Sequence, residues 1–257
     1  MMNKPRKKSA TLTYHVVIKG ADRQLLFEES NDYKKYLEII KKYKKKFGFE
    51  LFAYCLMPNH VHLLIRHPKD SSLENIFRCI NTSYSVWFNS KYNRTGYLQN
   101  GRYHSEPIED DQYLMTVLRY IHFNPTKAGI ETHPGSSYSW NSYYDYQKKI
   151  AGSREKTLTD HSLVLGIMGN PEYFIALHDK IPHEACMDID QFSKRLPDDV
   201  AREIIFQVSK CCSTTEFQKL SISNRNQFIK VIHEKGVSIR QINRLAGISK
   251  GIIQKVI

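Results

Sequence analysis

The sequence has 257 residues, enough for one large domain or two smaller ones, and 41% of them are hydrophobic, as in an ordinary soluble globular protein. No stretch approaches the roughly 20 apolar residues of a membrane span, and no apolar segment follows the basic N-terminus, which argues against a membrane protein and against a secretory signal. The net charge of +12 favours a polyanionic partner, and 16 tyrosines with 12 phenylalanines favour single strands, whose unpaired bases stack on aromatic rings.

Cysteine usage points to a reducing compartment. The five cysteines are an odd number and include no Cys-x-x-Cys pair, so a disulfide framework and a cysteine-rich zinc site are both disfavoured. Because disulfides persist mainly in oxidising compartments, this usage fits a cytoplasmic protein.

The first half of the sequence alternates strand patterns with helix patterns. Runs of β-branched and aromatic residues predict strands, and apolar residues three or four apart predict helices. The predicted elements are, in chain order, a strand at 11–20, a helix at 33–48, strands at 49–57 and 60–66, a helix at 72–93, a strand at 102–109, and a helix at 110–124 that Pro125 is expected to end. The order β-α-β-β-α-β, followed by one further helix, predicts a ferredoxin-like fold of the α+β class.

The C-terminal part predicts a smaller all-α domain. Residues 224–257 carry three short helical patterns, and a turn at 246–249 separates the last two, as in the helix-turn-helix domains of repressors. A plain helical bundle with a basic surface is the alternative. If the segment binds DNA, the candidate contacts are Arg240, Arg244, Lys250 and Lys255.

Two short segments carry the chemistry. In the strand at 60–66, His60 and His62 are two residues apart and therefore leave the same face. In the following helix pattern, Tyr120 and Asn124 are four residues apart and therefore stack on one face. Either pair alone is a weak signal, since such residues usually pack in a core. Together they offer two imidazoles, an amide oxygen and a phenol, a set that suits metal-assisted attack by a tyrosine on a phosphodiester.

These segments also resemble a known family. The triplet HVH at 60–62 is similar to the His-hydrophobe-His signature of the HUH single-strand DNA nucleases. The run GRYHSEPIEDDQYLMTVLRYIHFNPTKAGI at 101–130 resembles the catalytic-helix region of REP-associated tyrosine transposases and their single-tyrosine insertion-sequence relatives, and SYSWNSYYDY at 137–146 resembles the segment that closes that domain. The resemblance covers about the first 150 residues. It implies a ferredoxin-like domain with an added helix that bears the catalytic tyrosine.

The resemblance implies roles for individual residues. Tyr120 would be the nucleophile of a single-strand DNA endonuclease and strand-transferase, with a covalent 5′-phosphotyrosine intermediate. A mixed nitrogen and oxygen set from His60, His62 and Asn124 suits Mg²⁺ or Mn²⁺. Relatives often carry Gln or a third His where Asn124 stands, and asparagine has a shorter arm than glutamine. Tyr113 is the alternative nucleophile.

Other residues near these segments are weaker candidates. The candidates for contacts to phosphates or bases are Arg102, Tyr103, Arg119 and Lys127. For each of them an ordinary surface role is an equally good interpretation. His122 is expected to be structural, and His15, His67 and His104 receive no role. The chain is divided into a catalytic domain at 1–150, a linker with short helices at 151–190 and a helix-turn-helix-like domain at 191–257.

Alternative functions remain open at this point. A ferredoxin-like fold also suits a non-catalytic regulator that binds hairpin DNA or RNA, although the histidine pair would then have no task. A zinc hydrolase is disfavoured because no His-Glu-x-x-His spacing occurs. The expected partner is single-stranded or hairpin DNA. The target sequence, a mobile-element or domesticated role, and a homodimer in which Tyr120 acts in trans are left open.

Overall fold

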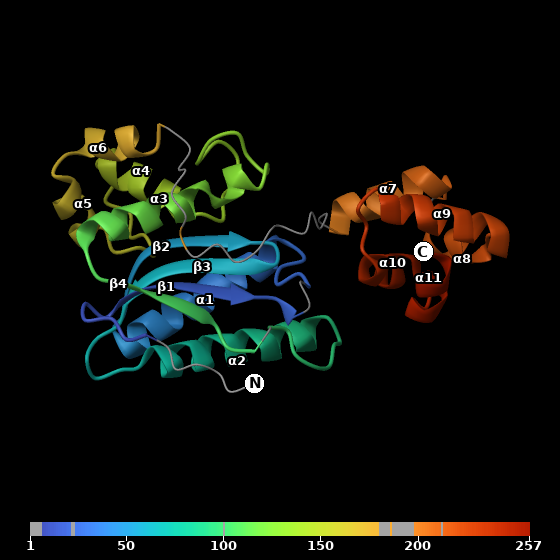
Figure 1. Cartoon of the computed structure of the whole chain (residues 1–257), viewed down its shortest axis with the longest axis horizontal. Coiled ribbons are helices and arrows are strands. Elements are labelled where there is room, and N and C mark those ends of the chain that lie inside the picture. The colour runs from blue at the N-terminus through green and yellow to red at the C-terminus, as the bar shows by residue number, and fades with distance from the viewer. Residues whose placement is uncertain (1–6, 22–23, 100, 180–185, 187–197, 212) are drawn as a thin grey trace. The chain divides into compact units, whose positions relative to one another are not determined.

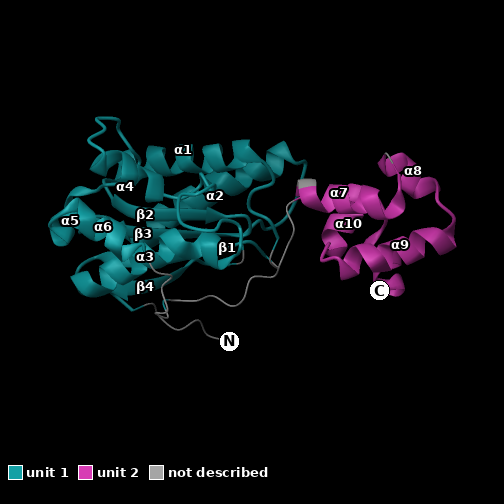
Figure 2. Ribbon diagram, turned by 90° about the horizontal axis from the view of Figure 1, so that it is seen from above, with its two compact units in different colours: residues 1–189 teal, residues 190–257 magenta. Residues whose placement is uncertain are grey.

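The computed structural model describes residues 7–21, 24–99, 101–179, 186, 198–211 and 213–257. The chain divides into two compact units, Met1–Ile189 and Asp190–Ile257 (Figure 2). No helix within the described ranges is long and apolar enough to cross a bilayer.

The first unit is built on a four-stranded antiparallel sheet with the order β2-β3-β1-β4. Its strands are β1 (Thr13–Lys19), β2 (Glu50–Met57), β3 (His60–Arg66) and β4 (His104–Ile108). Two helices, α1 (Ser30–Phe47) and α2 (Leu73–Lys91), cover one face of the sheet, and α3 (Asp111–Lys127) lies on the other (Figure 1). This is the ferredoxin-like arrangement of the α+β class with an added helix, so the fold prediction is confirmed.

Strand β3 shows how the sequence separates the two faces. Successive side chains of a strand point to opposite sides. Val61, Leu63 and Ile65 therefore join the core beneath α1 and α2, whereas Leu64 joins the core beneath α3. His62 shares the side of Leu64, and this parity places the histidine pair against α3.

A buried carboxylate joins α1 to α2. The side chain of Asp32 is fully buried and accepts hydrogen bonds from the backbone N–H groups of Glu28 and Glu29 at 2.7 and 3.1 Å and from the Tyr92 hydroxyl at 2.8 Å. The ammonium of Lys91 forms an ion pair with its other oxygen. A charge this deeply buried is tolerated only when it is paired and hydrogen-bonded, and both conditions are met.

Helix α3 continues past Pro125, so the predicted end at that residue is wrong. The helix runs to Lys127, and Pro125 is inside it. A proline removes only its own N–H from the hydrogen-bond ladder. The final turn is closed instead by the Ala128 N–H, which donates to the Asn124 carbonyl at 3.0 Å, and by the Ile130 N–H, which donates to the Pro125 carbonyl at 2.9 Å.

Three short helices follow α3 and complete the core on its side of the sheet. They are α4 (Tyr143–Ile150), α5 (Ser162–Met168) and α6 (Pro171–Leu177). Val164, Met168 and Phe174 are buried in the same core as Leu118 of α3. The described part of the range 151–190, which the sequence assigns to a linker with short helices, thus contributes two helices to the first unit.

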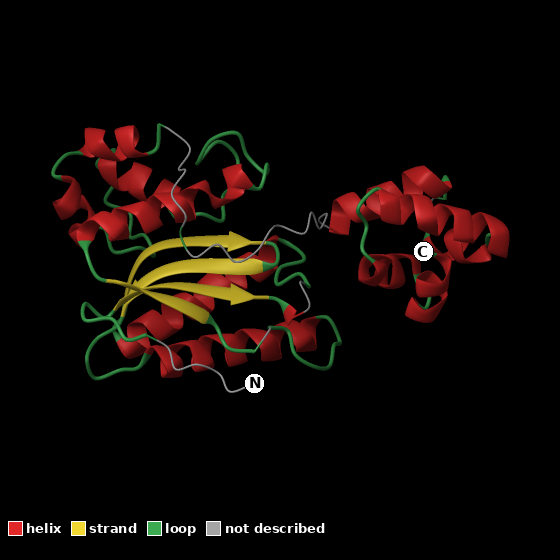
Figure 3. Cartoon of the chain, in the orientation of Figure 1, coloured by secondary structure: helices red, strands yellow, loops and turns green. Residues whose placement is uncertain are grey.

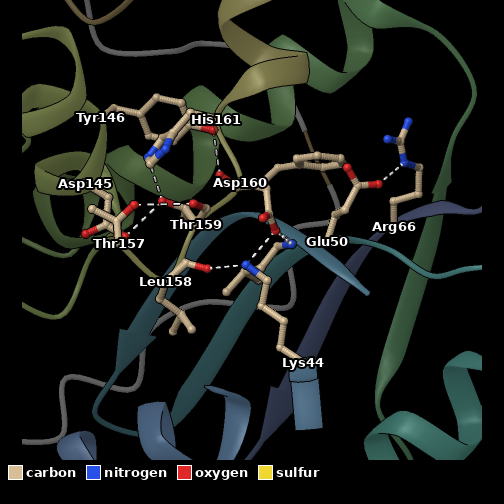
Figure 4. A network of polar contacts seen from close by, with 12 residues as sticks. Lys44, Glu50, Arg66, Asp145, Tyr146, Thr157, Leu158, Thr159, Asp160 and His161 are labelled. Carbon is tan, nitrogen blue, oxygen red and sulfur yellow. Dashed lines mark hydrogen bonds and ion pairs between the residues drawn. The ribbon is translucent and has the colours of Figure 1, made fainter. Parts of the chain in front are cut away.

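The outer edge of β2 is held by a later segment. The Leu51 N–H donates to the Asp160 carboxylate at 2.8 Å, and the Asp160 N–H donates to the Leu51 carbonyl at 2.7 Å. The ammonium of Lys44 lies 2.7 Å from that carboxylate and donates to the Leu158 carbonyl at 2.7 Å (Figure 4). Since unpaired strand edges recruit other strands, these contacts protect this part of β2 from strand addition.

A pair of buried histidines lies between α3, α6 and the segment before α4. His122 Nδ1 is 2.9 Å from His178 Nε2, and His122 Nε2 is 3.0 Å from the Ser142 hydroxyl. Burial lowers the pKa of His178 to about 4 and lowers the pKa of His122 well below its usual value. Both rings are therefore neutral at pH 7, and His122 is structural.

We expect this pair to make the first unit sensitive to acid. In the unfolded chain His178 takes up its proton near pH 6.5, but in the folded chain only near pH 4, so stability is intact above 6.5 and is lost as the pH falls between these values. At pH 5 this residue alone should cost about 2 kcal/mol. Urea denaturation at pH 7.5 and pH 5 measures the loss. A His178→Gln protein should lose less than the wild type, and His67→Gln, at a partly exposed position, should lose as much. An equal loss in all three would contradict the assignment.

The second unit is entirely helical in its described part (Figure 3). It comprises α7 (Asp198–Ser209), α8 (Thr214–Lys219), α9 (Ile222–Glu234), α10 (Ile239–Ala246) and α11 (Lys250–Val256). Its own core includes Phe217, Ile229, Ile242 and Ile253. Between α10 and α11, Gly247 adopts a left-handed conformation with φ of 68°, which ends α10 and turns the chain.

Candidate active site

The two histidines of β3 lie on the face of the sheet that α3 covers. In the register of the sheet, His60 pairs with Lys19 of β1, and His62 pairs with Val17. The two rings are edge to face, with centroids 4.9 Å apart. His60 is partly exposed, whereas His62 is 2% exposed. The pair thus extends from the solvent-accessible end of the strand toward the interior.

Helix α3 brings Tyr120 to the histidines. The Tyr120 ring is 5.7 Å from the ring of His62 and is 3% exposed. Asn124 is one turn further along, buried as well, and its side-chain Nδ2 donates to the Tyr120 carbonyl at 3.0 Å. Residues 58 positions apart in the sequence are therefore neighbours in space.

A third histidine, for which no role was predicted, belongs to this cluster. His15 of β1 is fully buried, its Nε2 is 3.0 Å from His62 Nδ1, and its ring is 5.9 Å from that of Tyr120. Burial lowers the pKa of His15 to about 3 and lowers the pKa of His62 well below its usual value. Both imidazoles are neutral, and their contact fixes the orientation of the His62 ring.

The donor set fits a divalent cation in its chemistry. His60 Nδ1 is 2.7 Å from the Asn59 side-chain oxygen, and His62 Nδ1 faces His15, so each histidine would bind a metal through Nε2. Since Asn124 uses its amide nitrogen within the helix, its oxygen is the atom suited to a cation. No three His, Cys, Asp or Glu side chains in the described ranges are arranged to hold a metal ion.

Of the four flanking residues singled out in the sequence, Lys127 lies beside the tyrosine. Its ammonium is 4.5 Å from the centroid of the Tyr120 ring, and the side chain is exposed. Arg119 lies over the Phe123 ring instead, at 5.9 Å. Tyr103 is packed against Phe77 in the core beneath α2, which leaves its ring no face for a base.

Arg102 and Tyr113 occupy other surroundings. Arg102 is exposed just before β4 and lines a groove beside α2. Tyr113 is half-buried near the start of α3, and its hydroxyl is hydrogen-bonded to Glu106. This bond and the burial both raise the pKa of Tyr113, with burial the larger cause, so its hydroxyl is a poor source of phenolate.

The candidate DNA contacts of the second unit differ in their surroundings. Lys250 and Lys255 are exposed on α11. Arg244 forms an ion pair with Asp198 at the start of α7, and Arg240 is partly buried. The two lysines are therefore better placed for a phosphate than the two arginines.

Comparison with known proteins gives a family match within the first unit. Residues 8–124 match the model of the family described as "Transposase IS200 like". This range includes all four strands, α1, α2 and α3 as far as Asn124. These residues are therefore similar to the IS200-like transposases.

Three individual proteins are similar to parts of the chain. A protein of Haemophilus influenzae that bears the name of a candidate REP-associated tyrosine transposase is 26% identical over 140 residues, which cover 49% of this chain and 77% of that protein. The structure of a REP-associated tyrosine transposase bound to a REP hairpin has a TM-score of 0.51 and 19% identity, over 63% of this chain and 96% of that one. A candidate transposase of Deinococcus radiodurans has a TM-score of 0.33 and 22% identity, over 47% and 95%.

Proposed function

We propose that the protein is a metal-dependent single-strand DNA endonuclease and strand-transferase that acts on hairpin DNA through Tyr120. The observation that carries this proposal is the position of Tyr120, with its ring 5.7 Å from His62 and one helical turn from Asn124. The similarity of residues 8–124 to the IS200-like transposases supports an enzyme that acts on DNA. The hairpin in the related solved structure supports the form of the DNA.

The proposed reaction is a phosphoryl transfer to the tyrosine. The phenol of Tyr120 gives up its proton as its oxygen attacks the phosphorus, the bond from phosphorus to the 3′ oxygen breaks, and that oxygen takes up a proton to become a 3′-hydroxyl, so no proton is gained or lost overall. The product is a 5′-phosphotyrosine. Since one phosphoester replaces another, the bond energy is retained, and a 3′-hydroxyl can later attack the phosphotyrosine to rejoin the strand.

The residues around Tyr120 have separate tasks in this reaction. The ammonium of Lys127, 4.5 Å from the ring, stabilises the negative charge that develops on the phenol. His15 holds His62 in a fixed orientation. His60, His62 and Asn124 would hold Mg²⁺ or Mn²⁺, which would polarise the scissile phosphate.

A covalent assay tests the proposal. The protein is incubated with Mn²⁺ and a hairpin oligonucleotide that carries a single-stranded extension, with the label placed on the 3′ side of the cleavage point. A labelled band at the mass of the protein on a denaturing gel is the expected result. Absence of the adduct, while the hairpin is still bound, would make the chain a non-catalytic hairpin-binding regulator.

The proposal that the second unit contacts duplex DNA has its own prediction. Reversing two exposed charges by Lys250→Glu and Lys255→Glu should weaken hairpin binding and reduce the salt slope of log Kd by about 2, because two phosphate contacts are lost. The matched control reverses two other exposed lysines of the same unit, Lys219 and Lys235, and changes the net charge equally. Fluorescence anisotropy at several salt concentrations measures both. Equal effects in the two proteins would show that overall charge, rather than α11, governs binding.

A further inference from the structure

A groove of about 470 Å³ lies along α2 in the first unit, away from the tyrosine and the histidines. One wall is α2, and the other is the segment that leads into β4. Its lining includes Arg78, Asn81, Asn89, Tyr97, Gln99 and Arg102. Aromatic, amide and cationic side chains thus share one concave surface, which is the combination that single-stranded nucleic acids bind.

Three buried polar atoms in this groove have no hydrogen-bond partner among the residues that the structure describes. They are the side-chain oxygens of Asn81 and Asn89 and the side-chain nitrogen of Gln99. Buried polar atoms are nearly always paired in folded proteins, so these three groove-lining side chains keep hydrogen-bonding capacity for a polar ligand. The set contains both acceptors and a donor, as the edge of a nucleobase does.

The groove also displays an aromatic ring on a firmly held backbone. Tyr97 is 91% exposed, although a large aromatic side chain normally buries most of its surface. The Gln24 side-chain nitrogen donates to the Tyr97 carbonyl at 2.9 Å, and that of Asn89 donates to the Gly96 carbonyl at 2.9 Å. The backbone is fixed on both sides of the ring, which is therefore pre-arranged to stack on a base.

The groove adjoins the end of the sheet where the histidine pair begins. Gly20, directly after β1, pairs with Gln99 of the groove, and its N–H donates to the Asn59 carbonyl at 2.9 Å. Asn59 in turn contacts the ring of His60. A side chain at Gly20 would come within 2.0 Å of the backbone oxygen of Gln24, so the close approach of Gly20 to Gln24 requires glycine. A strand that reaches the histidines can therefore continue around this end of the sheet into the groove.

From these observations we propose that the groove binds unpaired nucleotides of the DNA strand that enters the active site. This inference rests on the proposed function and adds a second contact with the same substrate. Tyr97 stacks on a base, the orphaned amide groups bond base edges, and Arg78 and Arg102 contact phosphates. Asn81 and Asn89 are eight residues apart on α2, about 12 Å at the helical rise, so the groove accommodates more than one nucleotide.

The test measures binding rather than cleavage, so that it stands if the proposed chemistry fails. All variants are made in a Tyr120→Phe protein without added metal. Anisotropy compares a blunt hairpin with the same hairpin carrying a single-stranded extension. Tyr97→Ala should weaken binding of the extended hairpin about tenfold and leave the blunt hairpin unchanged. The matched control, Tyr173→Ala, removes another exposed tyrosine of the first unit and should change neither affinity.

Two outcomes would overturn the proposal. One is equal affinity of the Tyr97→Ala protein and its parent for the extended hairpin. The other is an equal loss for the blunt and extended hairpins, which would place duplex DNA rather than a single strand at Tyr97. Because Tyr97 is exposed, its removal should leave the melting temperature unchanged, and this measurement separates loss of a contact from loss of the fold.

Discussion

Replacement of Tyr120 by Phe is expected to abolish formation of the covalent DNA adduct, with a loss of at least about a thousandfold in cleavage rate. The substitution removes the attacking oxygen and nothing else of the ring. The contacts of the ring with His62, His15 and Lys127 should therefore persist, and binding of single strands should remain nearly unchanged. Cleavage of a labelled oligonucleotide on a denaturing gel, with anisotropy for binding, measures both properties.

Tyr113→Phe is the matched control for this experiment. Tyr113 stands on the same helix, seven residues before Tyr120, and is the alternative nucleophile. Its hydroxyl is held by Glu106 outside the histidine cluster, so the control should retain cleavage. Cleavage by the Tyr120→Phe protein together with its loss in the Tyr113→Phe protein would move the nucleophile to Tyr113.

The alternation of side chains along a strand and the spacing along a helix explain why the residues of the candidate site could be grouped from the sequence. The strand pattern around His60 and His62 and the helix pattern around Tyr120 and Asn124 each fix one face, and His62, Tyr120 and Asn124 on these faces are buried. Strand β3 is buried on both faces, so parity alone does not decide which of them meets α3. The ferredoxin-like order of elements then brings α3 onto the side of the sheet where the histidines point.

The third histidine shows where such reasoning ends. His15 shares a face with His62 only because β1 and β3 pair in one register, with His15 opposite Leu64 and Val17 opposite His62. A shift of one residue would turn His15 to the other face. Register is set by the packing of the whole sheet, which the local pattern does not contain. The hydrogen bond between His15 and His62 therefore appears only in the structure.

The local sequence pattern also could not predict which side chains are buried or which form ion pairs with distant residues. Tyr103 is an aromatic residue of the type that stacks on bases, yet its ring is packed against Phe77. Arg244 has the charge of a phosphate contact, yet it pairs with Asp198, 46 residues earlier. Pro125 has the character of a helix terminator, yet buried neighbours and the bonds of the following turn keep it inside α3. In each case tertiary packing outweighs the local preference.

The substitution His60→Ala removes the imidazole and is expected to abolish metal-dependent cleavage. It should also weaken Mn²⁺ binding by about 100-fold or more, because loss of a residue that only supports a metal ligand already costs about 10–100-fold. His60 is partly exposed, so the fold should tolerate the change better than removal of the buried His62. Calorimetric titration of Mn²⁺ into the DNA-free protein reports the metal site without any cleavage.

The control for this variant is His67→Ala. His67 follows β3 directly and is partly exposed like His60, but its ring stacks on Tyr14, on the face of the sheet opposite Tyr120. The control should bind Mn²⁺ and cleave DNA as the wild type does. Equal Mn²⁺ affinity of the wild type and the His60→Ala protein would reject the metal assignment. If cleavage were also retained, the phosphate would have to be stabilised by the protein's own cations, with Lys127 beside Tyr120 the first to test.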